Sequence, residues 1–322
     1  MTSTVEKGGV IEDTMTTNPD QPGYGKDDLE QIIELLVAPN PVLNTSGGRS
    51  SGIGLTTRNL RVCLSHYATG LTADGYKDTA RESRWGPVER PEQEIKAEIF
   101  ARYKFLLELL TLHHPEFTSP DRKFTLLNVG EGSGGNNTSL YDYLVSQVLQ
   151  DRIDSWGIDI NPDVIAKARE RHPERSNRLY LMNLLNQEKP MVYPLDSGKN
   201  FPWFENTAPD FPSQFDVVIA SGIFCLPVDD PNTYIEQTFR RMLATSKFGF
   251  AANFMARANT DWREPLLRYT RTDDVLEIVN KISTEVGIPL KCQIAQEQSK
   301  KYEFTVYVVR DGNTTTPHGS IR

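Results

Sequence analysis

The chain has 322 residues, with 43 Asp and Glu against 35 Lys and Arg, and a formal net charge of -8. This acidic balance disfavours a nucleic acid as the main partner, because a surface that binds phosphates normally presents a basic stripe. No apolar stretch approaches the roughly 18 residues that cross a bilayer, and the first residues lack the basic start and apolar run of a secretory signal. We therefore expect a cytoplasmic protein with a small-molecule partner and neither a nucleic-acid nor a membrane partner. A homodimer is left open.

The three cysteines, Cys63, Cys225 and Cys292, are odd in number and far apart, so they predict reduced thiols and not a disulfide framework. The sequence also lacks an HExxH motif, a paired Cys-x-x-Cys and a carboxylate cluster at ligand spacing. We therefore expect no metal site.

The first third of the chain is helical and irregular in its pattern. Residues 1–25 are rich in Thr, Gly, Pro and Asp without an apolar period, which predicts a disordered leader. Residues 26–120 carry helical periods, the longest in EQEIKAEIFARYKFLLELLTLHH, and we expect this region to cover the acceptor pocket of the main domain. Residues 313–322 are predicted to form a flexible tail.

Residues 121–312 alternate short apolar runs with helical periods. FTLLNVG stops at glycines, as a buried parallel strand does. Further strands are predicted at 154–160, 178–185, 215–221 and 248–255, with helices between them, the first of which is TSLYDYLVSQVLQD. LKCQIAQEQ and YEFTVYVVR are too close for a crossover helix and should pair antiparallel. The sequence thus predicts a Rossmann-like α/β fold: a seven-stranded, mostly parallel sheet with helices on both faces, an antiparallel C-terminal hairpin and an N-terminal helical extension.

Glycines 130, 132, 134 and 135 lie between the first strand of this domain and the helix that follows. Glycine in this position lets the backbone approach a ligand and leaves helix N-terminal amides free to meet it. Gly130, Gly132 and Gly135 also match the dinucleotide pattern GxGxxG, so an NAD-dependent oxidoreductase is an alternative. Such an enzyme often has a Tyr and a Lys on one helix as proton donor, and no TyrxxxLys pattern follows the fourth strand.

Asp159 ends the second strand and should lie beside the glycine loop. A carboxylate there can accept hydrogen bonds from both hydroxyls of an adenosine ribose, which NAD and S-adenosylmethionine enzymes both need. Alternatively, an Asp just before Asn-Pro caps the helix at Pro162. Together with the glycine loop, the position favours ribose binding.

Three segments, in their order and spacing, resemble class I S-adenosylmethionine-dependent methyltransferases over about residues 95–310. LLNVGEGSGG is similar to the first motif of that family, GIDINPDVIAKARERH to the second motif with its helix, and FDVVIASGIFCLP to the fourth. The segments SGIF, FGFAANFM and YEFTVYVVR resemble a subgroup of small-molecule or carbohydrate-modifying methyltransferases. The resemblance implies S-adenosylmethionine as cofactor and methyl transfer to O or N of a small molecule, such as a sugar or secondary metabolite. A non-catalytic S-adenosylmethionine-binding protein of the same fold is a further alternative.

The resemblance assigns the cofactor to residues that follow the first four strands. They are Asn128, Gly130, Glu131, Gly132, Gly134, Asp159, Ile160, Asn183, Leu184 and Ser221. The family usually has acids where this chain has Asn128 and Asn183, which keep a carbonyl acceptor but lose the charge. We expect either weaker cofactor binding or compensation by the carboxylate of Glu131.

The acceptor side carries weaker signals. A hydroxyl acceptor would benefit from a general base, and His66 and Tyr67 are the candidate catalytic pair, with a structural histidine as the alternative. Trp85, Phe224 and Asn253 are candidate substrate contacts. For Phe224 the alternative is a core aromatic, and for Trp85 a solvated surface loop.

Overall fold

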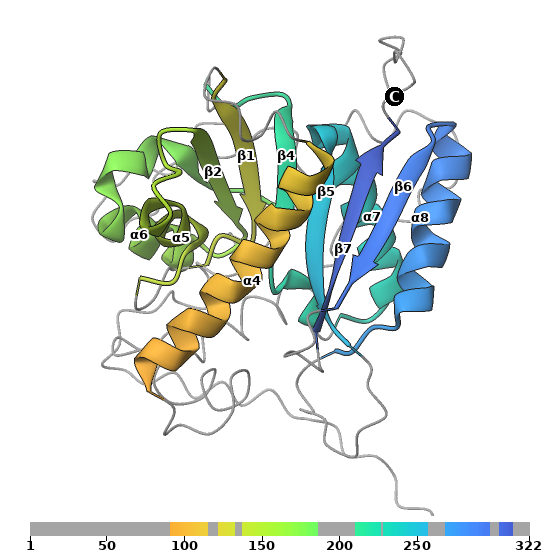
Figure 1. Cartoon of the computed structure of the whole chain (residues 1–322), viewed down its shortest axis with the longest axis horizontal. Coiled ribbons are helices and arrows are strands. Elements are labelled where there is room, and N and C mark those ends of the chain that lie inside the picture. Colours follow the sequence, from red (N-terminus) through yellow and green to blue (C-terminus); the bar gives the residue numbers. More distant parts are fainter. Residues whose placement is uncertain are drawn as a thin grey trace, which may run out of the picture.

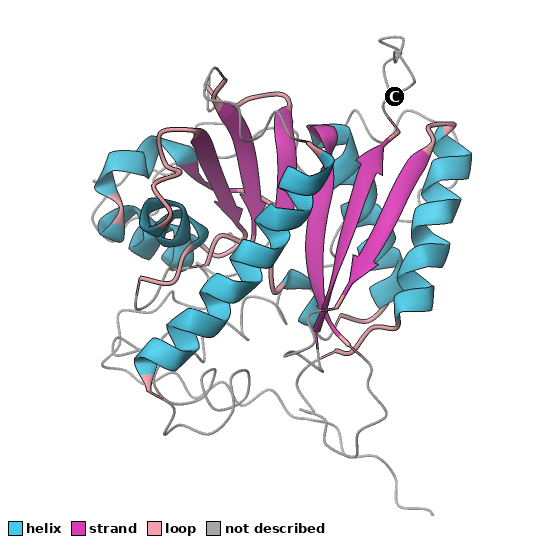
Figure 2. Cartoon of the chain, viewed as in Figure 1, coloured by secondary structure: helices cyan, strands magenta, loops and turns pink. Residues whose placement is uncertain are grey.

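The computed structural model describes residues 91–114, 122–132, 137–185, 210–226, 228–256, 268–296 and 303–311. Within these ranges the chain folds around one seven-stranded sheet, which is magenta in Figure 2. Its strands are β1 (Phe124–Val129), β2 (Ile153–Asp159), β3 (Leu179–Leu181), β4 (Phe215–Ala220), β5 (Ser246–Met255), β6 (Leu290–Ala295) and β7 (Glu303–Arg310). They lie side by side in the order β3-β2-β1-β4-β5-β7-β6.

The first five strands are parallel and the last two are antiparallel to their neighbours. β1 pairs with β2 and β4, and β3 and β5 extend this parallel set on either side. β7 runs antiparallel between β5 and β6, so β6 forms the edge of the sheet. The Rossmann-like, mostly parallel sheet with an antiparallel C-terminal hairpin is therefore confirmed.

Helices cover both faces of the sheet (Figure 1). The described helices are α4 (Glu92–His113), α5 (Leu140–Ser146), α6 (Pro162–Arg171), α7 (Pro231–Thr245) and α8 (Thr272–Val286), with the short 3₁₀ helices η2 (Pro173–Arg178) and η3 (Ile223–Cys225). One face packs against α4 and α5 in a core that contains Leu106, Tyr143 and Ile219. The other face packs against α7 and α8 in a core that contains Val218 and Phe239. Because both faces are covered, every residue of β4 is buried, which explains the apolar run at 217–220; the buried Asp216 before it pairs with Arg122 and Lys247.

Local sequence signals define where the helices next to the sheet begin. Ser139 and Asp142 form a capping box at the start of α5, in which each side chain accepts the backbone N–H of the other residue. Asp230 caps α7 with its side chain, and Pro231 occupies the first turn, where its missing N–H costs nothing.

α4 confirms the long amphipathic helix of the sequence, and its second half belongs to the core of the sheet. Tyr103 and Leu106 are buried against the strands. Arg102 forms a bidentate ion pair with Glu303 at the start of β7. Glu303 lies opposite Met255 at the end of β5, so the turns of α4 before Arg102 extend past the carboxyl edge of the parallel strands (Figure 1).

Two elements are shorter than the sequence pattern indicated. β3 stops at Leu181 because the chain turns at Asn183, whose Oδ1 accepts the backbone N–H of Leu185. α5 stops at Ser146, and Val148 then has a φ of 58°, a conformation that L residues rarely adopt and that a helix cannot contain. In both cases a local backbone turn ends an element whose apolar pattern continues.

Part of the predicted organisation lies outside the described residues. This holds for the leader at 1–25, for residues 26–90 of the N-terminal region and for the tail at 313–322. Their roles stay predictions. Of the helices that the structure describes, none combines the length and the hydropathy needed to span a bilayer.

Candidate functional site

A pocket lies at the carboxyl edge of the parallel strands, where open α/β sheets bind their ligands. Gly130 follows β1, Asp159 ends β2, Asn183 follows β3 and Ile223 follows β4, so four neighbouring strands each contribute a residue. The other lining residues are Val129, Ile158, Ile160, Met182, Leu184, Leu185, Leu226, Tyr234 and Thr238. The pocket therefore combines a largely apolar wall with the carboxylate of Asp159.

The backbone after β1 approaches the pocket at Gly130 and Gly132. Their φ angles are 79° and 72°, a region that glycine adopts without strain. A Cβ on Gly130 would collide with Cγ2 of Ile223, whereas a Cβ on Gly132 would meet no atom of the described residues within 4 Å. The backbone N–H groups of Gly130 and Glu131 both donate to the carbonyl oxygen of Ile158 at 2.9 Å. The loop is thus hydrogen-bonded to β2 through both residues.

Asp159 holds its carboxylate between the glycine loop and the start of α6. Its Oδ1 accepts the backbone N–H of Asn161 at 2.9 Å, and its Oδ2 accepts that of Gly132 at 3.1 Å. Burial raises the pKa of Asp159 to about 6, and the negative charge of Glu131 acts in the same direction, against the backbone hydrogen bonds from Asn161, Gly132 and Ile160. The acid is therefore buried, oriented and poised to lose or gain a proton near neutral pH.

The alternative in which Asp159 caps the helix at Pro162 is wrong. Oδ1 of Asn161 accepts the backbone N–H of Val164 at 3.4 Å, so Asn161 caps α6. Asp159 instead stabilises the turn before this cap and lines the pocket.

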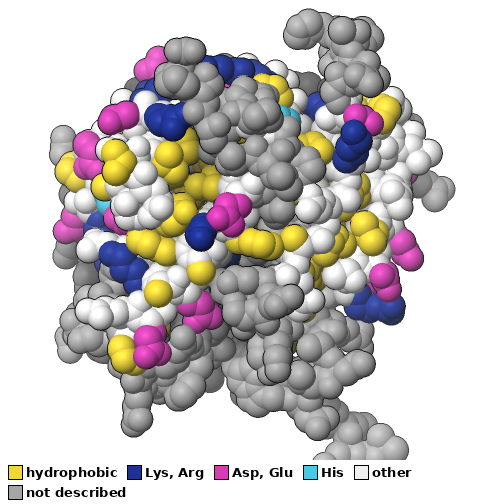
Figure 3. Space-filling model, viewed as in Figure 1, with side chains coloured by type: hydrophobic (Ala, Val, Ile, Leu, Met, Phe, Trp, Pro, Cys, Tyr) yellow, Lys and Arg dark blue, Asp and Glu magenta, His cyan; other side chains and the backbone are white. Residues whose placement is uncertain are grey.

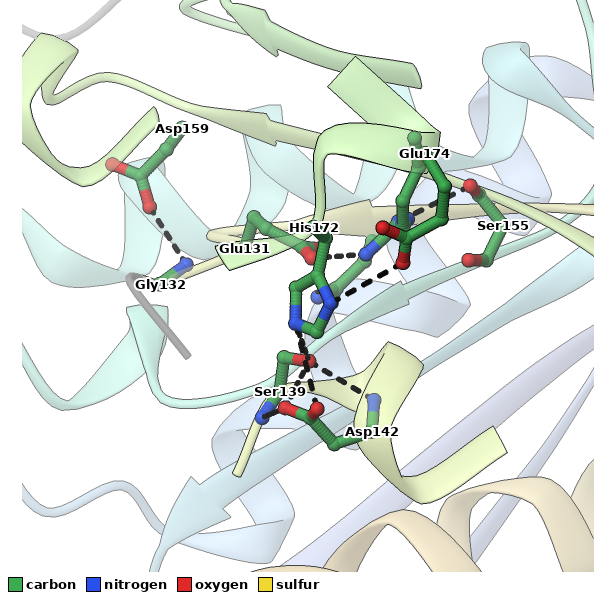
Figure 4. A network of polar contacts seen from close by, with 10 residues as sticks. Glu131, Gly132, Ser139, Asp142, Ser155, Asp159, His172 and Glu174 are labelled. Atoms are coloured by element: carbon green, nitrogen blue, oxygen red, sulfur yellow. Dashed lines mark hydrogen bonds and ion pairs between the residues drawn. The ribbon is translucent and has the colours of Figure 1, made fainter. Parts of the chain in front are cut away.

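Glu131 points away from the pocket, although it lies between the two glycines of the loop (Figure 4). Its Oε2 accepts a hydrogen bond from Nδ2 of Asn128 at 2.8 Å, and its Oε1 pairs with Nη1 of Arg175 at 2.9 Å. Only 1% of the Glu131 side chain is exposed. The expectation that Glu131 presents a compensating carboxylate to the cofactor is therefore corrected, because a buried arginine holds this carboxylate beneath the loop.

The two asparagines in place of acids have different surroundings. Asn128 is buried within β1, does not line the pocket and supports the loop through Glu131. Asn183 lines the pocket, and its Oδ1 accepts the backbone N–H of Leu185 at 3.1 Å. The amide oxygen of Asn183 therefore already closes the turn after β3, and any ligand must share it.

No protein-family model matches the chain, and no curated protein matches it. Solved structures that resemble it include the magnesium protoporphyrin IX methyltransferase of Synechocystis PCC 6803 with bound SAM. It has 11% identity over 78% of this chain and 97% of that chain, with a TM-score of 0.46. A SAM-dependent methyltransferase of Aquifex aeolicus has 14% identity over 73% and 94%, with a TM-score of 0.35. The cyclase SpnF has 14% identity over 81% and 98%, with a TM-score of 0.43. Since likeness at this level says nothing of the reaction, the chemistry has to be inferred from the site.

Of the residues predicted to bind the cofactor, five lie together in the pocket. They are Gly130, Asp159, Ile160, Asn183 and Leu184. The sequence pattern missed Tyr234 and Thr238 of α7, which also line it. Their spacing of four residues on the first turns of a helix after β4 was the available signal, because such a pair shares one helix face. The pattern also missed Arg175, for which the sequence carries no signal.

The residues after β4 and in β5 form a second layer beside the pocket. Oδ1 of Asn253 accepts the backbone N–H of Gly222 at 2.8 Å and so holds the turn that follows Ser221. Phe224 is only 1% exposed, and its ring stacks on that of Phe254 with 4.6 Å between centroids. The core alternative for Phe224 is therefore correct and its proposed role as a wall of the acceptor pocket is wrong. Neither Ser221 nor Asn253 is among the pocket-lining residues.

Four predicted site residues lie outside the described residues: His66, Tyr67, Trp85 and Gly134. Their roles in catalysis, substrate contact and cofactor binding stay predictions. Cys225 is buried, and its Sγ donates to the carbonyl oxygen of Gly222 at 2.8 Å, in agreement with a packed thiol.

Proposed function

We propose that the chain is an S-adenosylmethionine-dependent methyltransferase that methylates O or N of a small molecule. The observation that carries this proposal is the buried carboxylate of Asp159, which lines an apolar pocket beside the backbone of Gly130 and Gly132. A nucleoside needs both elements: a flat base packs against apolar side chains, and its ribose hydroxyls donate to a carboxylate.

The residues of the pocket suit a nucleoside in shape and in polarity. Ile160, Leu184 and Ile223 offer apolar surface to a base. Each oxygen of Asp159 already accepts a backbone N–H, and a carboxylate has about four acceptor positions, so Asp159 retains capacity for a ribose hydroxyl. Among the described residues, no atom lies within 4 Å of the place that a Cβ on Gly132 would take, so they leave the backbone there open to the rest of the ligand.

The strand order argues against the NAD-dependent alternative. The dinucleotide-binding sheet has the order 3-2-1-4-5-6. Here the antiparallel strand β7 separates β5 from β6. The glycines alone fit both cofactors, so this difference in the sheet, together with the motifs of the sequence, favours S-adenosylmethionine.

S-adenosylmethionine, when bound, would supply a methyl group on a positively charged sulfur. An acceptor would attack the methyl carbon in line with the carbon–sulfur bond, and the sulfur would leave as a neutral thioether. The part of this chain is then to hold the nucleoside at Asp159, to exclude water and to align the acceptor. We propose His66 and Tyr67 as the groups that take the proton of a hydroxyl acceptor.

A small acceptor, such as a sugar or secondary metabolite, fits the charge of the chain better than a nucleic acid does. The formal net charge is -8. On the coloured part of the face in Figure 3, Lys and Arg side chains lie in several separate places and form no continuous stripe. A phosphate backbone would need such a stripe.

Calorimetric titration with S-adenosylmethionine, S-adenosylhomocysteine and NAD tests the proposal. The first two should bind and NAD should not. Asp159→Asn should weaken the binding of S-adenosylhomocysteine by about 30-fold, since a hydrogen bond to a charged group contributes roughly 2 kcal/mol. Asp154→Asn is the matched control, because Asp154 lies on the same strand but contacts Trp156 and Arg178 instead of the pocket. Binding of NAD alone, or equal losses in both variants, would contradict the proposal.

A non-catalytic protein that binds the same cofactor is the second candidate. The observation in its favour is that neither Asn128 nor Glu131 presents a carboxylate to the pocket. Tight binding of S-adenosylhomocysteine without methyl transfer to a broad panel of hydroxyl and amine acceptors would support it. Turnover of any acceptor at a rate that falls in Asp159→Asn would exclude it.

A further inference from the structure

A buried ion pair lies directly beneath the glycine loop. Nη1 of Arg175 is 2.9 Å from Oε1 of Glu131, and the two side chains are 5% and 1% exposed. Removing two charges from water costs several kcal/mol per ion unless the geometry of the pair and its further hydrogen bonds compensate. A pair at this depth therefore needs further partners; among the described residues, Oε2 of Glu131 and Nη2 of Arg175 have them, whereas Nε of Arg175 has none.

Beyond Glu131, two parts of the fold hold Arg175, namely β2 and α5. Its Nη2 donates to the carbonyl oxygen of Ser155 in β2 at 3.1 Å. Its guanidinium lies over the ring of Tyr141 in α5, 4.5 Å from the ring centroid. Its backbone, with φ -118° and ψ 22°, interrupts the 3₁₀ helix η2. These contacts give the guanidinium a fixed position against β2.

Glu131 reaches Arg175 only because the neighbouring strand has a glycine. A Cβ on Gly157 would lie 2.5 Å from Oε2 of Glu131, so any other residue at this position would displace the carboxylate. Asn128 donates to the same oxygen at 2.8 Å. Glu131 is therefore anchored from β1, from β2 and from η2.

The anchored residue lies between Gly130, which lines the pocket, and Gly132, whose backbone N–H contacts the pocket residue Asp159. Gly130 precedes it against Ile223, and Gly132 follows it and donates its N–H to Oδ2 of Asp159. The place of the Glu131 side chain thus sets where the N–H of Gly132 meets the acid of the pocket.

We infer that Arg175 is a positioning residue of the cofactor site: through Glu131 it holds the glycine loop, and through Gly132 the loop orients Asp159 toward the ligand. This inference rests on the proposed function only for the identity of the ligand. Arg175 does not line the pocket. Its effect should therefore pass entirely through Glu131.

Titration with S-adenosylhomocysteine, well below the unfolding temperature of each variant, tests this route. Arg175→Met should weaken binding about tenfold or more, because it leaves the Glu131 charge buried without a partner. The double variant Arg175→Met with Glu131→Gln should recover most of this loss, since it removes that charge. Arg175→Lys keeps the charge and should fall between wild type and Arg175→Met.

Arg102→Met is the matched control, because it breaks another buried arginine–glutamate pair, that with Glu303, which joins α4 to β7. It should lower the unfolding temperature and leave the affinity unchanged. If Arg175→Met does the same, or if Glu131→Gln does not relieve its defect, Arg175 is merely structural and the inference is overturned.

A ligand-free measurement separates this inference from the proposed function. Glu131–Gly132 is the sole Glu-Gly step of the sequence, so ¹³C-carbonyl Glu and ¹⁵N-Gly labelling isolates the Gly132 amide signal. In wild type this signal should follow the titration of Asp159. In Arg175→Met the midpoint should rise or the titration should vanish, and the double variant should restore it. A titration midpoint of the Gly132 signal that is unchanged in Arg175→Met would refute the inference. A wild-type protein that does not bind S-adenosylhomocysteine would refute only the proposed function.

Discussion

The backbone N–H of Gly132 donates to Oδ2 of Asp159 at 3.1 Å, so the glycine loop and the acid of the pocket form one hydrogen-bonded unit. The other oxygen of Asp159 is held by the N–H of Asn161 at the start of α6. A displacement of the loop after β1 therefore reorients the carboxylate at the end of β2. This coupling makes several properties of the site measurable.

Affinity for S-adenosylhomocysteine should depend on pH through Asp159. Its pKa is raised to about 6 by burial, and ribose hydroxyls need the ionised carboxylate as acceptor. With this pKa, the affinity should fall about tenfold between pH 7 and pH 5. Calorimetry across this range checks it. Asp159→Asn should bind weakly with no such step, and a step that persists in Asp159→Asn would assign the titration to another group.

Stability should depend on the same acid with a defined sign. Between the ordinary Asp pKa and about 6, the folded state binds more protons at Asp159 than the unfolded state, so this group lowers the free energy of unfolding as pH rises. The free energy of unfolding of Asp159→Asn minus that of wild type should therefore increase by roughly 2 kcal/mol from pH 4 to pH 6 and become level above about pH 7. Urea denaturation at each pH measures it. Parallel profiles for the two proteins would rule out a raised pKa.

The two loop glycines should respond differently to alanine. Gly130→Ala should cost about 2 to 4 kcal/mol of stability, because the backbone strain adds to a collision with Ile223. Gly132→Ala should lower the stability by only about 1 kcal/mol, since the backbone is strained but the new methyl group meets no described atom. It should nevertheless weaken the binding of S-adenosylhomocysteine, because the methyl group would lie in front of the loop.

Gly287→Ala at the end of α8 is the control for both glycines, because Gly287 has a φ of 66° and open space around it, far from the pocket. Thermal denaturation and calorimetry of the three variants separate strain, collision and ligand contact. If Gly132→Ala and Gly287→Ala had equal affinity for S-adenosylhomocysteine, Gly132 would not contact the ligand.

Phe224→Leu should affect stability and not cofactor affinity. The ring packs between Phe254 and Phe239 in the core, so its loss should cost about 1 to 3 kcal/mol. Thr238→Val is the informative comparison, because it keeps the size of a side chain that lines the pocket. If Phe224→Leu weakened ligand binding and Thr238→Val did not, Phe224 would have to be assigned to the ligand site.

The sequence predicted the sheet well because its signals are local. Strands such as β1 and β4 are short, mostly apolar runs followed by glycines or turns, and the short link between β6 and β7 already required antiparallel pairing. Since the ends of parallel strands meet at one edge, the pattern also brought Gly130, Asp159 and Asn183 to one pocket.

The pattern of apolar residues could not predict the direction in which individual side chains point. Glu131 turns inward because Arg175, which is 44 residues away, and Gly157 provide a buried place for its carboxylate. Phe224 turns into the core because it lies in the 3₁₀ helix η3, where its ring reaches Phe254. Such choices depend on contacts between distant segments, which periodicity does not encode.

The position of β7 has a consequence for how the chain is made. Residues 303–310 follow the other described strands in sequence, yet they fill a place inside the sheet. During synthesis, the side of β5 that receives β7 exposes unpaired N–H and C=O groups until the ribosome has passed Arg310. Closure is thus a late, long-range event, and such events leave nascent chains open to aggregation. A chain interrupted before β7 would lose an internal strand, so we expect it to aggregate and not to form a smaller stable domain.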